Sequence, residues 1–406
     1  MRFLFLNQFY PPDSAPTGRY LHDVATELVG RGHEVRVVCS RRAYATGQDL
    51  GPGDRLDGVE VERVRGAFLR ADSIPGRLAD HLSYFIQAAV RAALSSRPTD
   101  LVLCATSPPF LGLAGALAGR LRSIPRAEWV MDLYPDAIQA HWSGSDRPKR
   151  FAFLDALARL QLRRADLVLA LGASMAGRIG RYCPSTTRIE TVPLWSNLQP
   201  EESRAAELRA RRGWPLESTV LLYSGHMGRG HRFGEFLEAA RRLDSEGPLW
   251  TFIGSGLRRA EIEAFCRAHP TARVQLLESV AEGDVAASLA SADVHLLSLS
   301  AEWQGVIVPS KLQGAFAVAR PVILVGASES ETAVWIRESD GGWVVGENDV
   351  EGLLRAVSEA SDPAESRRRG LRGQEYARVH FDPVHNKARI ADLLERSASP
   401  VRIGAS

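Results

Sequence analysis

Cysteine is scarce in this sequence, and the cysteines present are widely spaced. The 406 residues contain four of them, at Cys39, Cys104, Cys183 and Cys266, and no CxxC pair. This spacing disfavours a disulfide framework and a structural zinc site, and it indicates a reducing cytosol. Asp-X-Asp triplets are absent too, and no other carboxylates gather at metal-ligand spacing. A divalent-metal site built from such carboxylates is therefore disfavoured.

Long apolar runs are also missing. No stretch reaches the roughly 18 consecutive apolar residues that a membrane-spanning helix needs. The opening segment FLFLNQFYPP is too short for a signal peptide, and no small-residue cleavage site follows it. We therefore expect a cytoplasmic protein.

The composition that remains is that of a globular protein with more than one core. Apolar residues make up 45% and charged residues 24%, which is ordinary for a soluble domain. The length predicts two or three domains. Residues 1–200 hold 25 basic and 19 acidic residues, whereas residues 201–406 hold 25 and 29. A basic half beside an acidic half indicates two domains with different partners.

Short apolar runs alternate with amphipathic stretches, and the alternation occurs twice. Six runs of the first half are predicted as buried strands: Phe3–Leu6, Val35–Val38, Val59–Val64, Leu101–Cys104, Trp129–Met131 and Leu167–Ala170. Five runs of the second half are predicted likewise: Val220–Tyr223, Thr251–Ile253, Val274–Leu277, Val294–Leu297 and Val322–Val325. Helical patterns such as Phe233–Leu243 and Ala260–Ala268 separate them, and Gly32 lies where a helix C-cap belongs. Strand and helix in alternation predict an α/β fold with two doubly wound parallel sheets.

A polar, charged stretch from Ser196 to Pro215 lies between the two patterns. We therefore predict a Rossmann-like domain over residues 1–195, a linker over 196–215 and a second Rossmann-like domain over 216–382. A helix and tail follow over 383–406. Because ligands bind at the carboxyl ends of strands in such sheets, the loops that directly follow strands are the candidates for a site.

The loop SGHMGRGHRF, Ser224 to Phe233, follows the first strand of the second domain. Its glycines let the backbone approach a ligand, and a helix start follows it. Four of its side chains supply cationic or donor groups: His226, Arg229, His231 and Arg232. The combination suits a diphosphate, although an ordinary glycine-rich turn with solvated arginines would read the same way.

The next strand ends in FIGSGLRR, which places Gly254 and Gly256 in a turn. A lone GxG is a weak signal, because a tight strand-to-helix turn needs glycine in any case. Arg259 stands where the third glycine of a dinucleotide fingerprint belongs. A dehydrogenase is therefore disfavoured, even though Glu278 lies about twenty residues on.

The most specific segment is AEWQGVIVPSKLQGAFAVARPVILVG, Ala301 to Gly326. Ser310 is predicted as the N-cap of a helix that ends before Pro321, and Lys311 adds a cation beside a helix start that favours anions. Glu302 could accept hydrogen bonds from sugar hydroxyls. The alternative is a capped helix with a surface lysine.

In the first domain, carboxylates follow a strand in WVMDLYPD, at Asp132 and Asp136. Carboxylates at this position could orient a hydroxyl or assist proton transfer, and a structural aspartate in a turn would look alike. Three further residues, His22, His141 and Trp142, are predicted to be packing or surface residues.

These segments together resemble a known family. The motifs that carry the resemblance are LNQFYPPDSAPTGRYLHDVATELVGRGHEVRVV, VMDLYPD, YSGHMGRGH, IGSG and VIVPSKLQGAFAVARPVILVG. They are similar to those of family 4 glycosyltransferases with the GT-B fold, in the branch of bacterial colanic-acid and O-antigen assembly, over nearly the whole chain. The resemblance implies two Rossmann-like domains that face each other across a cleft, an N-terminal acceptor domain and a C-terminal donor domain. It also implies that the last helix crosses back to the first domain.

The resemblance further implies retaining transfer from a nucleotide-diphospho-sugar, UDP- or GDP-linked, to a saccharide or lipid-linked saccharide. It implies no essential metal, no resident cofactor and no nucleic-acid partner. Among the named residues, the catalytic candidates are Asp132, Arg229, Lys311 and Glu302. The candidates for donor binding are Gly18, Gly225, His226, Arg229, His231, Arg232, Gly254, Gly256, Val280, Glu302, Gly305, Val306, Ile307, Ser310, Lys311 and Gly314.

One position departs from the family pattern. Many members carry a glutamate that holds the nucleotide ribose, and Gly314 occupies the matching position here. The ribose contact is therefore open, and Glu302 alone is a candidate for the family's glutamate pair. Two other functions stay open: a sugar-nucleotide 2-epimerase of the same fold, which would convert donor without acceptor, and a non-catalytic partner subunit.

The basic charge of the first half also predicts peripheral contact with the inner membrane face. Two apolar-basic segments would make this contact, Phe68–Arg70 and Arg147–Phe151. Basic residues close to an anionic bilayer contribute on the order of 1 kcal/mol each, and salt weakens them.

Overall fold

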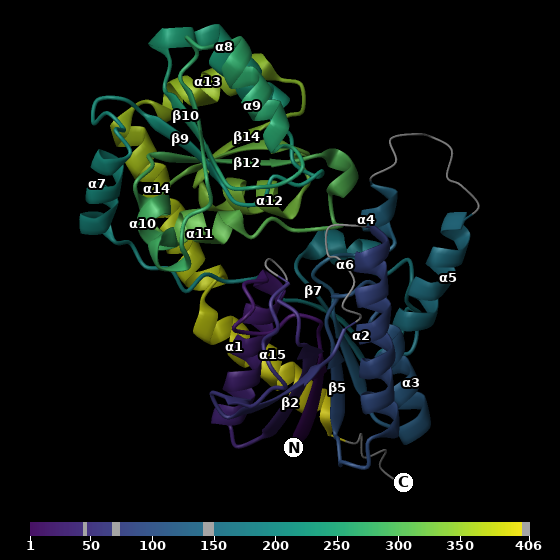
Figure 1. Ribbon diagram of the computed structural model, residues 1–406. Helices are drawn as coiled ribbons and strands as arrows, with labels where there is room; N and C mark the ends of the chain where they lie inside the picture. The colour runs from purple at the N-terminus through teal and green to yellow at the C-terminus, as the bar shows by residue number, and fades with distance from the viewer. Residues whose placement is uncertain (44–46, 67–73, 141–149, 400–406) are drawn as a thin grey trace. The chain divides into compact units, whose positions relative to one another are not determined.

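The computed structural model describes residues 1–43, 47–66, 74–140 and 150–399 (Figure 1). The chain forms two compact units. The first comprises Met1–Val192 with Val384–Ser406, and the second comprises Pro193–Pro383. Each unit is an α/β domain built around a single, mainly parallel sheet.

The first unit contains an eight-stranded sheet in the order β3-β4-β2-β1-β5-β6-β7-β8. Its strands are β1 (Arg2–Leu6), β2 (Glu34–Ser40), β3 (Arg55–Leu56), β4 (Val59–Val64), β5 (Leu101–Cys104), β6 (Arg126–Trp129), β7 (Leu167–Ala170) and β8 (Ile189–Thr191). Its helices are α1 (Pro16–Gly30), α2 (Ile74–Leu94), α3 (Gly112–Arg122), α4 (Asp136–Gln139), α5 (Arg150–Leu162), α6 (Ala173–Ile179) and the C-terminal α15 (Pro383–Ala398). Only the short β3 runs antiparallel to its neighbour.

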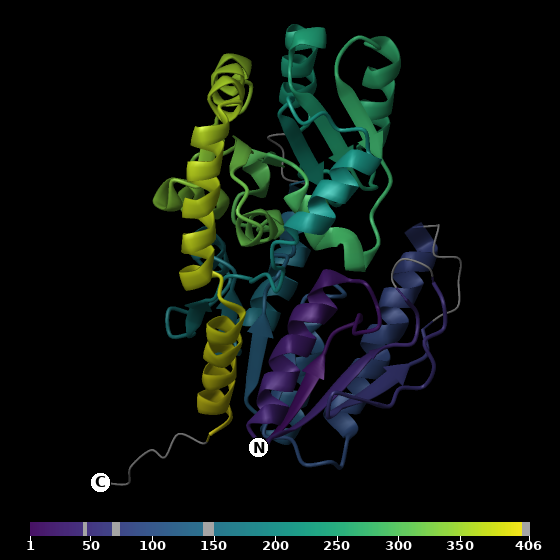
Figure 2. The same cartoon turned by 90° about the vertical axis from the view of Figure 1, so that its left-hand side faces the viewer.

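Two groups of helices cover the first sheet. The Arg31 guanidinium at the end of α1 donates to Asp392 and Glu395 of α15, which ties the C-terminal helix, yellow in Figure 2, to the purple α1. Helices α2, α3 and α5 form a separate layer, and in Figure 1 they lie side by side. The inner sides of α2 and α3 close a core with β1 and β5, through residues such as Tyr84, Ala114 and Val102.

The second unit contains a six-stranded sheet in the order β11-β10-β9-β12-β13-β14. Its strands are β9 (Val220–Ser224), β10 (Leu249–Ile253), β11 (Val274–Leu277), β12 (Val294–Leu299), β13 (Val322–Gly326) and β14 (Gly342–Val345). Its α-helices are α7 (Glu202–Arg211), α8 (Gly234–Leu243), α9 (Arg259–Ala268), α10 (Val285–Ala290), α11 (Lys311–Ala317), α12 (Glu331–Ser339), α13 (Val350–Ala360) and α14 (Pro363–His380). Short 3-10 turns include η3 (Ala301–Trp303), and an aromatic core of Tyr223, Phe233, Phe236, Trp250 and Phe252 lies beneath the sheet.

Both sheets have a switch point, where consecutive strands begin to be added in the opposite direction. In the first sheet it lies between β1 and β5, and in the second between β9 and β12. The loops that follow the two neighbouring strands at a switch point run to opposite faces of the sheet. They diverge there and leave room for a ligand at the carboxyl ends of these strands. The loops after β1, β5, β9 and β12 are therefore the ones that the fold positions for binding.

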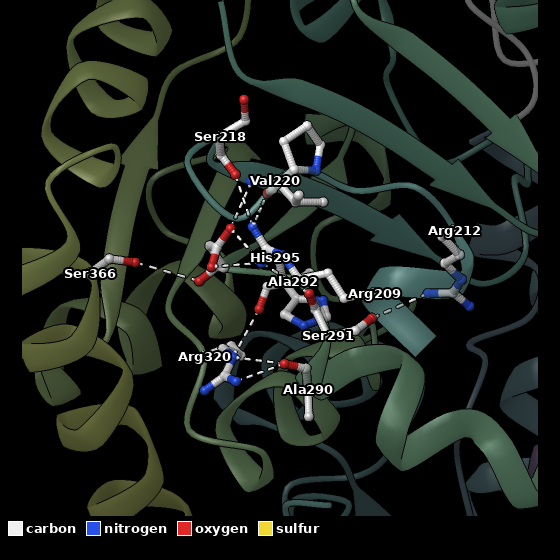
Figure 3. Close-up of polar contacts among 12 residues, drawn as sticks. Arg209, Arg212, Ser218, Val220, Ala290, Ser291, Ala292, His295, Arg320 and Ser366 are labelled. Atoms are coloured by element: carbon white, nitrogen blue, oxygen red, sulfur yellow. Dashed lines mark hydrogen bonds and ion pairs between the residues drawn. The ribbon is translucent and has the colours of Figure 1, made fainter. Parts of the chain in front are cut away.

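The stretch predicted as a linker, residues 196–215, is different in the structure, because it contains helix α7 and belongs to the second unit. Arg209 of α7 donates to both oxygens of Asp293 at 3.0 Å and to the carbonyls of Pro215 and Ser218. The same carboxylate accepts from the Val220 amide, so one ion pair fixes α7 to the first strand of the sheet. Figure 3 shows this cluster of polar contacts.

Other contacts hold α7 and α11 against α10, and Figure 3 draws those of Arg212 with Ser291 and of Arg320 with Ala290. Arg212 donates to the hydroxyls of Ser288 and Ser291. Arg320, after α11, donates to the carbonyls of Ala290 and Ala292. The bonds from Arg320 satisfy carbonyls at and just beyond the end of α10, where the helix itself leaves carbonyls without partners.

Candidate functional site

The centre of the candidate site in the second unit is the Lys311 ammonium. Lys311 is the first residue of α11, and its side chain is half-buried. Its Nζ lies 3.3 Å from His231 Nε2 and 5.0 Å from the centre of the Tyr223 ring. Among the described residues no carboxylate pairs with it. Burial lowers the pKa of Lys311 to about 8, so the cation is held in a site that lacks its counter-charge.

His231 is arranged to tolerate this cation. Its Nδ1 lies 2.6 Å from the Ser298 carbonyl, which can only accept, so Nδ1 carries the proton. Burial and the neighbouring Lys311 lower the pKa of His231 to about 3, and the ring is neutral at physiological pH. The Nε2 lone pair therefore faces Lys311 and accepts a hydrogen bond from it. The Tyr223 ring adds a cation–π contact from another direction.

The glycines of the two neighbouring loops make room for this arrangement. A Cβ at Gly225 would lie 2.9 Å from Lys311 Cε, so glycine is required for the lysine to reach its place. A Cβ at Gly254 would collide with the Gly225 carbonyl, and one at Gly256 would lie 2.6 Å from the Met227 carbonyl. In this structure the glycines of the IGSG turn thus serve loop-on-loop packing.

The loop between β12 and α11 supplies further predicted residues. Gly305 has a φ of 67° and is buried, and the amides of Val306 and Ile307 both donate to the Trp303 carbonyl. Ser310 stands at the predicted N-cap position, but its side chain makes no capping hydrogen bond. Glu302 in η3 is exposed. The amides of Val306 and Ile307 are therefore committed to the loop itself.

The predicted cations of the loop after β9 fall into two groups. Arg229 is exposed and makes no ion pair or hydrogen bond with the described residues, and His226 is exposed beside it. Arg232 instead donates to Glu235 and Asn348 and lies 3.5 Å from Glu347. Its charge is neutralised within the fold, which leaves Arg229 and Lys311 as the cations of this edge that are available to an anion.

Two predicted donor-binding residues face the core of the second unit. Val280 packs against the cluster that contains Leu222 and Ile253. Gly314 is buried, and a Cβ there would lie 3.1 Å from Leu289 Cδ1, on α10. A Cβ at position 314 would thus point into the contact between α10 and α11, and the prediction that this position faces the ribose stays a prediction.

The switch point of the first unit carries a polar group that the sequence did not reveal. Gln8, the second residue after β1, is buried, and its amide donates to the Ser107 carbonyl at 2.7 Å. The Gln8 side chain donates to Asp80 Oδ2 at 2.9 Å and accepts from His81 Nδ1 at 2.7 Å. Asp80 Oδ1 is buried and has no hydrogen-bond partner among the described residues. A ligand that offers hydroxyl groups would supply the missing donor.

The two aspartates of the VMDLYPD segment have different surroundings. Asp136 is buried and accepts from Arg178, Arg181 and the Tyr182 hydroxyl, so it is a structural residue. Asp132 makes no hydrogen bond or ion pair through its carboxylate with the described residues. Burial raises its pKa to about 6, which suits a group that exchanges a proton near neutral pH.

The remaining predicted residues of the first unit are Gly18, His22, His141 and Trp142. A Cβ at Gly18 would lie 2.8 Å from the Phe9 carbonyl, so glycine permits the close packing of α1 against the loop after β1. His22 bonds to the Tyr10 hydroxyl and to Asp57, as a packing residue would. His141 and Trp142 lie outside the described residues. Among the described residues, no three His, Cys, Asp or Glu side chains are grouped as metal ligands would be.

Comparison with known families matches both halves of the chain. Residues 17–195 match the model of a glycosyl transferase 4-like domain, and residues 218–362 match glycosyl transferases group 1. WcaI of Escherichia coli K12, which carries the name of a colanic acid biosynthesis glycosyl transferase, is 22% identical over 377 residues. The match covers 89% of this chain and 92% of the relative.

Solved structures agree on the fold. The sucrose-phosphate synthase of Thermosynechococcus elongatus superposes with a TM-score of 0.78 at 15% identity, over 98% of both chains. HepE of Anabaena, solved in complex with UDP-glucose, gives a TM-score of 0.71 at 16% identity, over 98% of this chain and 100% of that one. The two matched domains and the shared fold place this chain in family 4 of the glycosyltransferases, with the GT-B fold.

Proposed function

We propose that this chain is a retaining glycosyltransferase of cell-surface polysaccharide synthesis. It moves a sugar from a UDP- or GDP-linked donor to a hydroxyl of a saccharide acceptor. The name of the WcaI relative supports the polysaccharide context, and the UDP-glucose complex of HepE supports the class of donor.

The observation that carries the proposal is the half-buried Lys311 ammonium at the switch point of the second sheet. It has a neutral imidazole and an aromatic ring around it and no carboxylate among the described residues. A cation held in this way stabilises an incoming anion strongly, because little solvent competes for it. Arg229, exposed on the adjacent loop, adds a second positive charge for the diphosphate.

The proposed reaction is a substitution on one face of the sugar. The bond from the anomeric carbon to the diphosphate oxygen breaks, and a bond to the acceptor oxygen forms on the same side. The acceptor proton passes to the departing phosphate oxygen, so the configuration is retained and no strong protein base is needed. Lys311 and Arg229 stabilise the negative charge that grows on the diphosphate. These two cations do the work that a bound metal ion does in other transferases.

The acceptor is assigned to the first unit. Asp132, with its raised pKa, is proposed to hydrogen-bond the acceptor hydroxyl and keep it oriented. The buried Asp80 Oδ1 near Gln8 and His81 is proposed to bind a further hydroxyl of the acceptor sugar. Glu302 is proposed to contact hydroxyls of the donor sugar.

The test is titration of UDP and GDP into the protein, with Lys311→Ala as the variant and Lys387→Ala as its matched control. Lys387 lies on α15, in the first unit. We expect a nucleoside diphosphate to bind the wild type and the control alike and the Lys311 variant at least tenfold more weakly. Equal binding by all three proteins would remove Lys311 from the site, and no binding of either nucleotide would remove the proposed donor class.

A second experiment separates the proposal from its alternatives. The wild type is incubated with sugar nucleotides, with and without saccharide acceptors, and the products are identified by mass spectrometry. A transferase produces an extended acceptor. Conversion of the donor without acceptor would identify a 2-epimerase, and donor binding without any conversion would favour a non-catalytic subunit.

A further inference from the structure

An unbroken apolar line runs along the outer side of α2. Five aliphatic side chains are exposed on this helix, spaced four residues apart: Leu78, Leu82, Ile86, Val90 and Leu94. Their exposed fractions range from 46% to 73%. Residues four apart are neighbours on a helix surface and form a ridge that winds slowly around the helix axis, and the solvent side of a helix in a water-soluble domain is normally polar. This line is therefore an unusual feature of the fold.

The neighbouring helices extend the same face. Leu117 and Leu121 of α3 and Phe153 and Leu160 of α5 are 43% to 66% exposed. Helix α3 packs against α2 and against α5, and the three helices lie side by side in Figure 1. We call the nine exposed apolar residues of α2, α3 and α5 the apolar helical face. Exposed apolar groups of this extent on a soluble domain commonly mark a surface that binds something.

The exposed charges that the structure describes on these three helices are of one sign. Arg120 of α3 and Arg159 of α5 are exposed, and Arg163 and Arg164 are exposed just beyond α5. No exposed side chain that the structure describes on α2, α3 or α5 is acidic. The acidic residues of these helices are partly buried and engaged: Asp80 accepts from Gln8, and Asp155 accepts from Gln139. Asp166, two residues beyond Arg164, is exposed as well, so among the described residues the apolar helical face is bordered mainly by positive charge.

We propose that the apolar helical face docks on the surface of an anionic phospholipid bilayer. The aliphatic side chains would enter the boundary between headgroups and acyl chains, and the arginines would bind lipid phosphates. A second copy of the chain fits this face less well, because a symmetric contact would bring the same arginines together. In the part of the chain that the structure describes, no helix is long and apolar enough to cross the membrane. In the proposed contact, the helices lie on the surface of the bilayer.

This surface differs from the one that the sequence predicts. Segments 68–70 and 147–149 lie outside the described residues, and Phe151, predicted as an inserted residue, is buried. The α2 line is hard to recognise from the sequence, because the buried residues Tyr84, Ala88 and Ala92 of the same helix are apolar as well. Only burial separates the two sides.

The same helix joins the proposed membrane surface to the candidate acceptor site. Asp80 and His81 reach Gln8 at the edge of the sheet, and Leu78 and Leu82 beside them are exposed. An acceptor saccharide on a lipid anchor would reach that edge from a bilayer in contact with α2. The docking itself rests on the exposed residues alone and holds whether or not the proposed reaction is correct.

The test is co-sedimentation of the full chain with vesicles, in the absence of any sugar nucleotide. Vesicles of phosphatidylcholine alone are compared with vesicles that also contain phosphatidylglycerol. The apolar variant is Leu82→Gln with Ile86→Gln, and its matched control is Leu371→Gln with Val379→Gln on the exposed side of α14. The charge variant is Arg120→Gln with Arg163→Gln, and its control is Arg267→Gln with Arg355→Gln in the second unit.

We expect the wild type and both controls to sediment with the anionic vesicles at low salt and much less with the neutral ones. The apolar variant should bind roughly tenfold more weakly, because two inserted aliphatic side chains are lost. The charge variant should lose about fivefold per arginine, and added salt should weaken the wild type in the same way. Circular dichroism melts that match the wild type would show that the variants fold.

Three results would overturn the proposal. One is a wild type that sediments no better with anionic than with neutral vesicles. Another is equal loss of binding in the apolar variant and its control. The third is a wild type that is dimeric by light scattering, binds no vesicles and becomes monomeric on Leu82→Gln with Ile86→Gln, which would assign the apolar helical face to a second copy.

Discussion

Among the individual residues, Lys311 gives the most specific prediction for how nucleotide binding depends on pH. Burial lowers its pKa to about 8, so the free site holds a charged lysine below pH 8 and loses that charge as the pH rises above it. Affinity for a nucleoside diphosphate should therefore be constant between pH 6.5 and 7.5 and then fall, approaching tenfold per pH unit. Titration calorimetry from pH 7 to 10 measures this fall. Lys311→Met should bind weakly and show no such decline, and a similar decline in that variant would assign it to another group.

For Asp132, the raised pKa predicts that the ionised carboxylate destabilises the folded protein. Its folded pKa of about 6 lies above the value for an exposed aspartate, so the folded state prefers the protonated form. Asp132→Asn should therefore raise the free energy of unfolding above pH 6, by on the order of 2 kcal/mol, and this gain should vanish as the pH falls toward 4. Urea unfolding at pH 8 and pH 4 compares the two.

The same variant should lose turnover while its affinity for the nucleotide stays unchanged, because the proposed role of Asp132 concerns the acceptor. A variant that is neither more stable at pH 8 nor slower would show that the carboxylate is solvated and idle. Asp136→Asn serves as the contrast, since it breaks bonds to Arg178 and Arg181 and should destabilise the first unit.

A candidate site residue could be singled out from the sequence where the local chemistry is contained in one segment, and its role stays a prediction. The Pro-Ser-Lys turn identified Lys311, because a lysine at a helix start after a strand is visible in the order of residues. Gln8 and Asp80 meet across more than seventy residues, and nothing in either segment announces the contact. Arg232 is predicted as a phosphate ligand from the sequence, because its partners Glu347 and Asn348 are likewise far away along the chain. Nothing in the segment around Arg232 shows these two contacts.

At the level of secondary-structure elements, helix α7 should be fixed by its ion pair. Arg209→Ala removes the bonds to Asp293 and to the carbonyls of Pro215 and Ser218. Because charge-assisted hydrogen bonds to one carboxylate and two carbonyls are lost together, the free energy of unfolding of the second unit should fall by roughly 1.5–3 kcal/mol. Chemical denaturation measures this change.

The control for that experiment is Arg211→Ala on the same helix. Arg211 is exposed and lies 3.9 Å from Glu207, so its removal should change stability by no more than about 0.5 kcal/mol. Equal effects of the two substitutions would show that α7 is a loosely held linker, as the composition of residues 196–215 suggested.

Elements were predictable where burial follows the apolar pattern and misplaced where it does not. Strand β6 runs from Arg126 to Trp129, whereas the apolar run predicted Trp129–Met131. The reason is that Arg126 and Glu128 form a buried ion pair of 2.8 Å inside the strand. Gly112 leaves the space that the Glu128 carboxylate occupies. Charged residues inside a strand predict a loop when the sequence is considered alone, because the sequence does not show that the two charges pair with each other.

For the whole molecule, the two units should respond differently to acid. His295 in β12 is buried and donates to the Leu289 carbonyl, and burial lowers its pKa to about 4. Its contribution to stability is present above pH 6.5 and is lost as the pH falls toward 4, on the order of 3 kcal/mol. The neutral His231 acts in the same direction. Calorimetric scans at pH 7 and pH 4.5 should therefore show the second unit melting earlier at the lower pH.

His295→Gln separates this effect from general acid denaturation. Glutamine can keep a donor near the Leu289 carbonyl and cannot take up a proton. The variant should lose less stability than the wild type between pH 7 and pH 4.5, and an identical loss in both proteins would show that His295 does not govern the acid response.

The architecture was the most predictable level of all. Alternation of apolar runs and amphipathic helices is repeated throughout each unit, so single misplaced strands such as β6 do not change the inferred topology. Strand β14 and helix α14 were not predicted individually. Helix α14 is strongly polar on most sides and packs mainly through small residues such as Gly370 and Gly373, so it lacks the apolar periodicity that reveals a buried helix.

The proposed reaction is sugar transfer with retention, in which protein cations stabilise the negative charge of the departing diphosphate. The most direct measurement is the proton NMR spectrum of the product that the wild type forms from an α-linked sugar nucleotide and a saccharide acceptor in the presence of EDTA. We expect an α-linked product, formed at the same rate with and without the chelator, and turnover about 100- to 1,000-fold lower in Lys311→Ala and Arg229→Ala. A β-linked product, or activity that EDTA abolishes and magnesium or manganese restores, would contradict the proposed reaction.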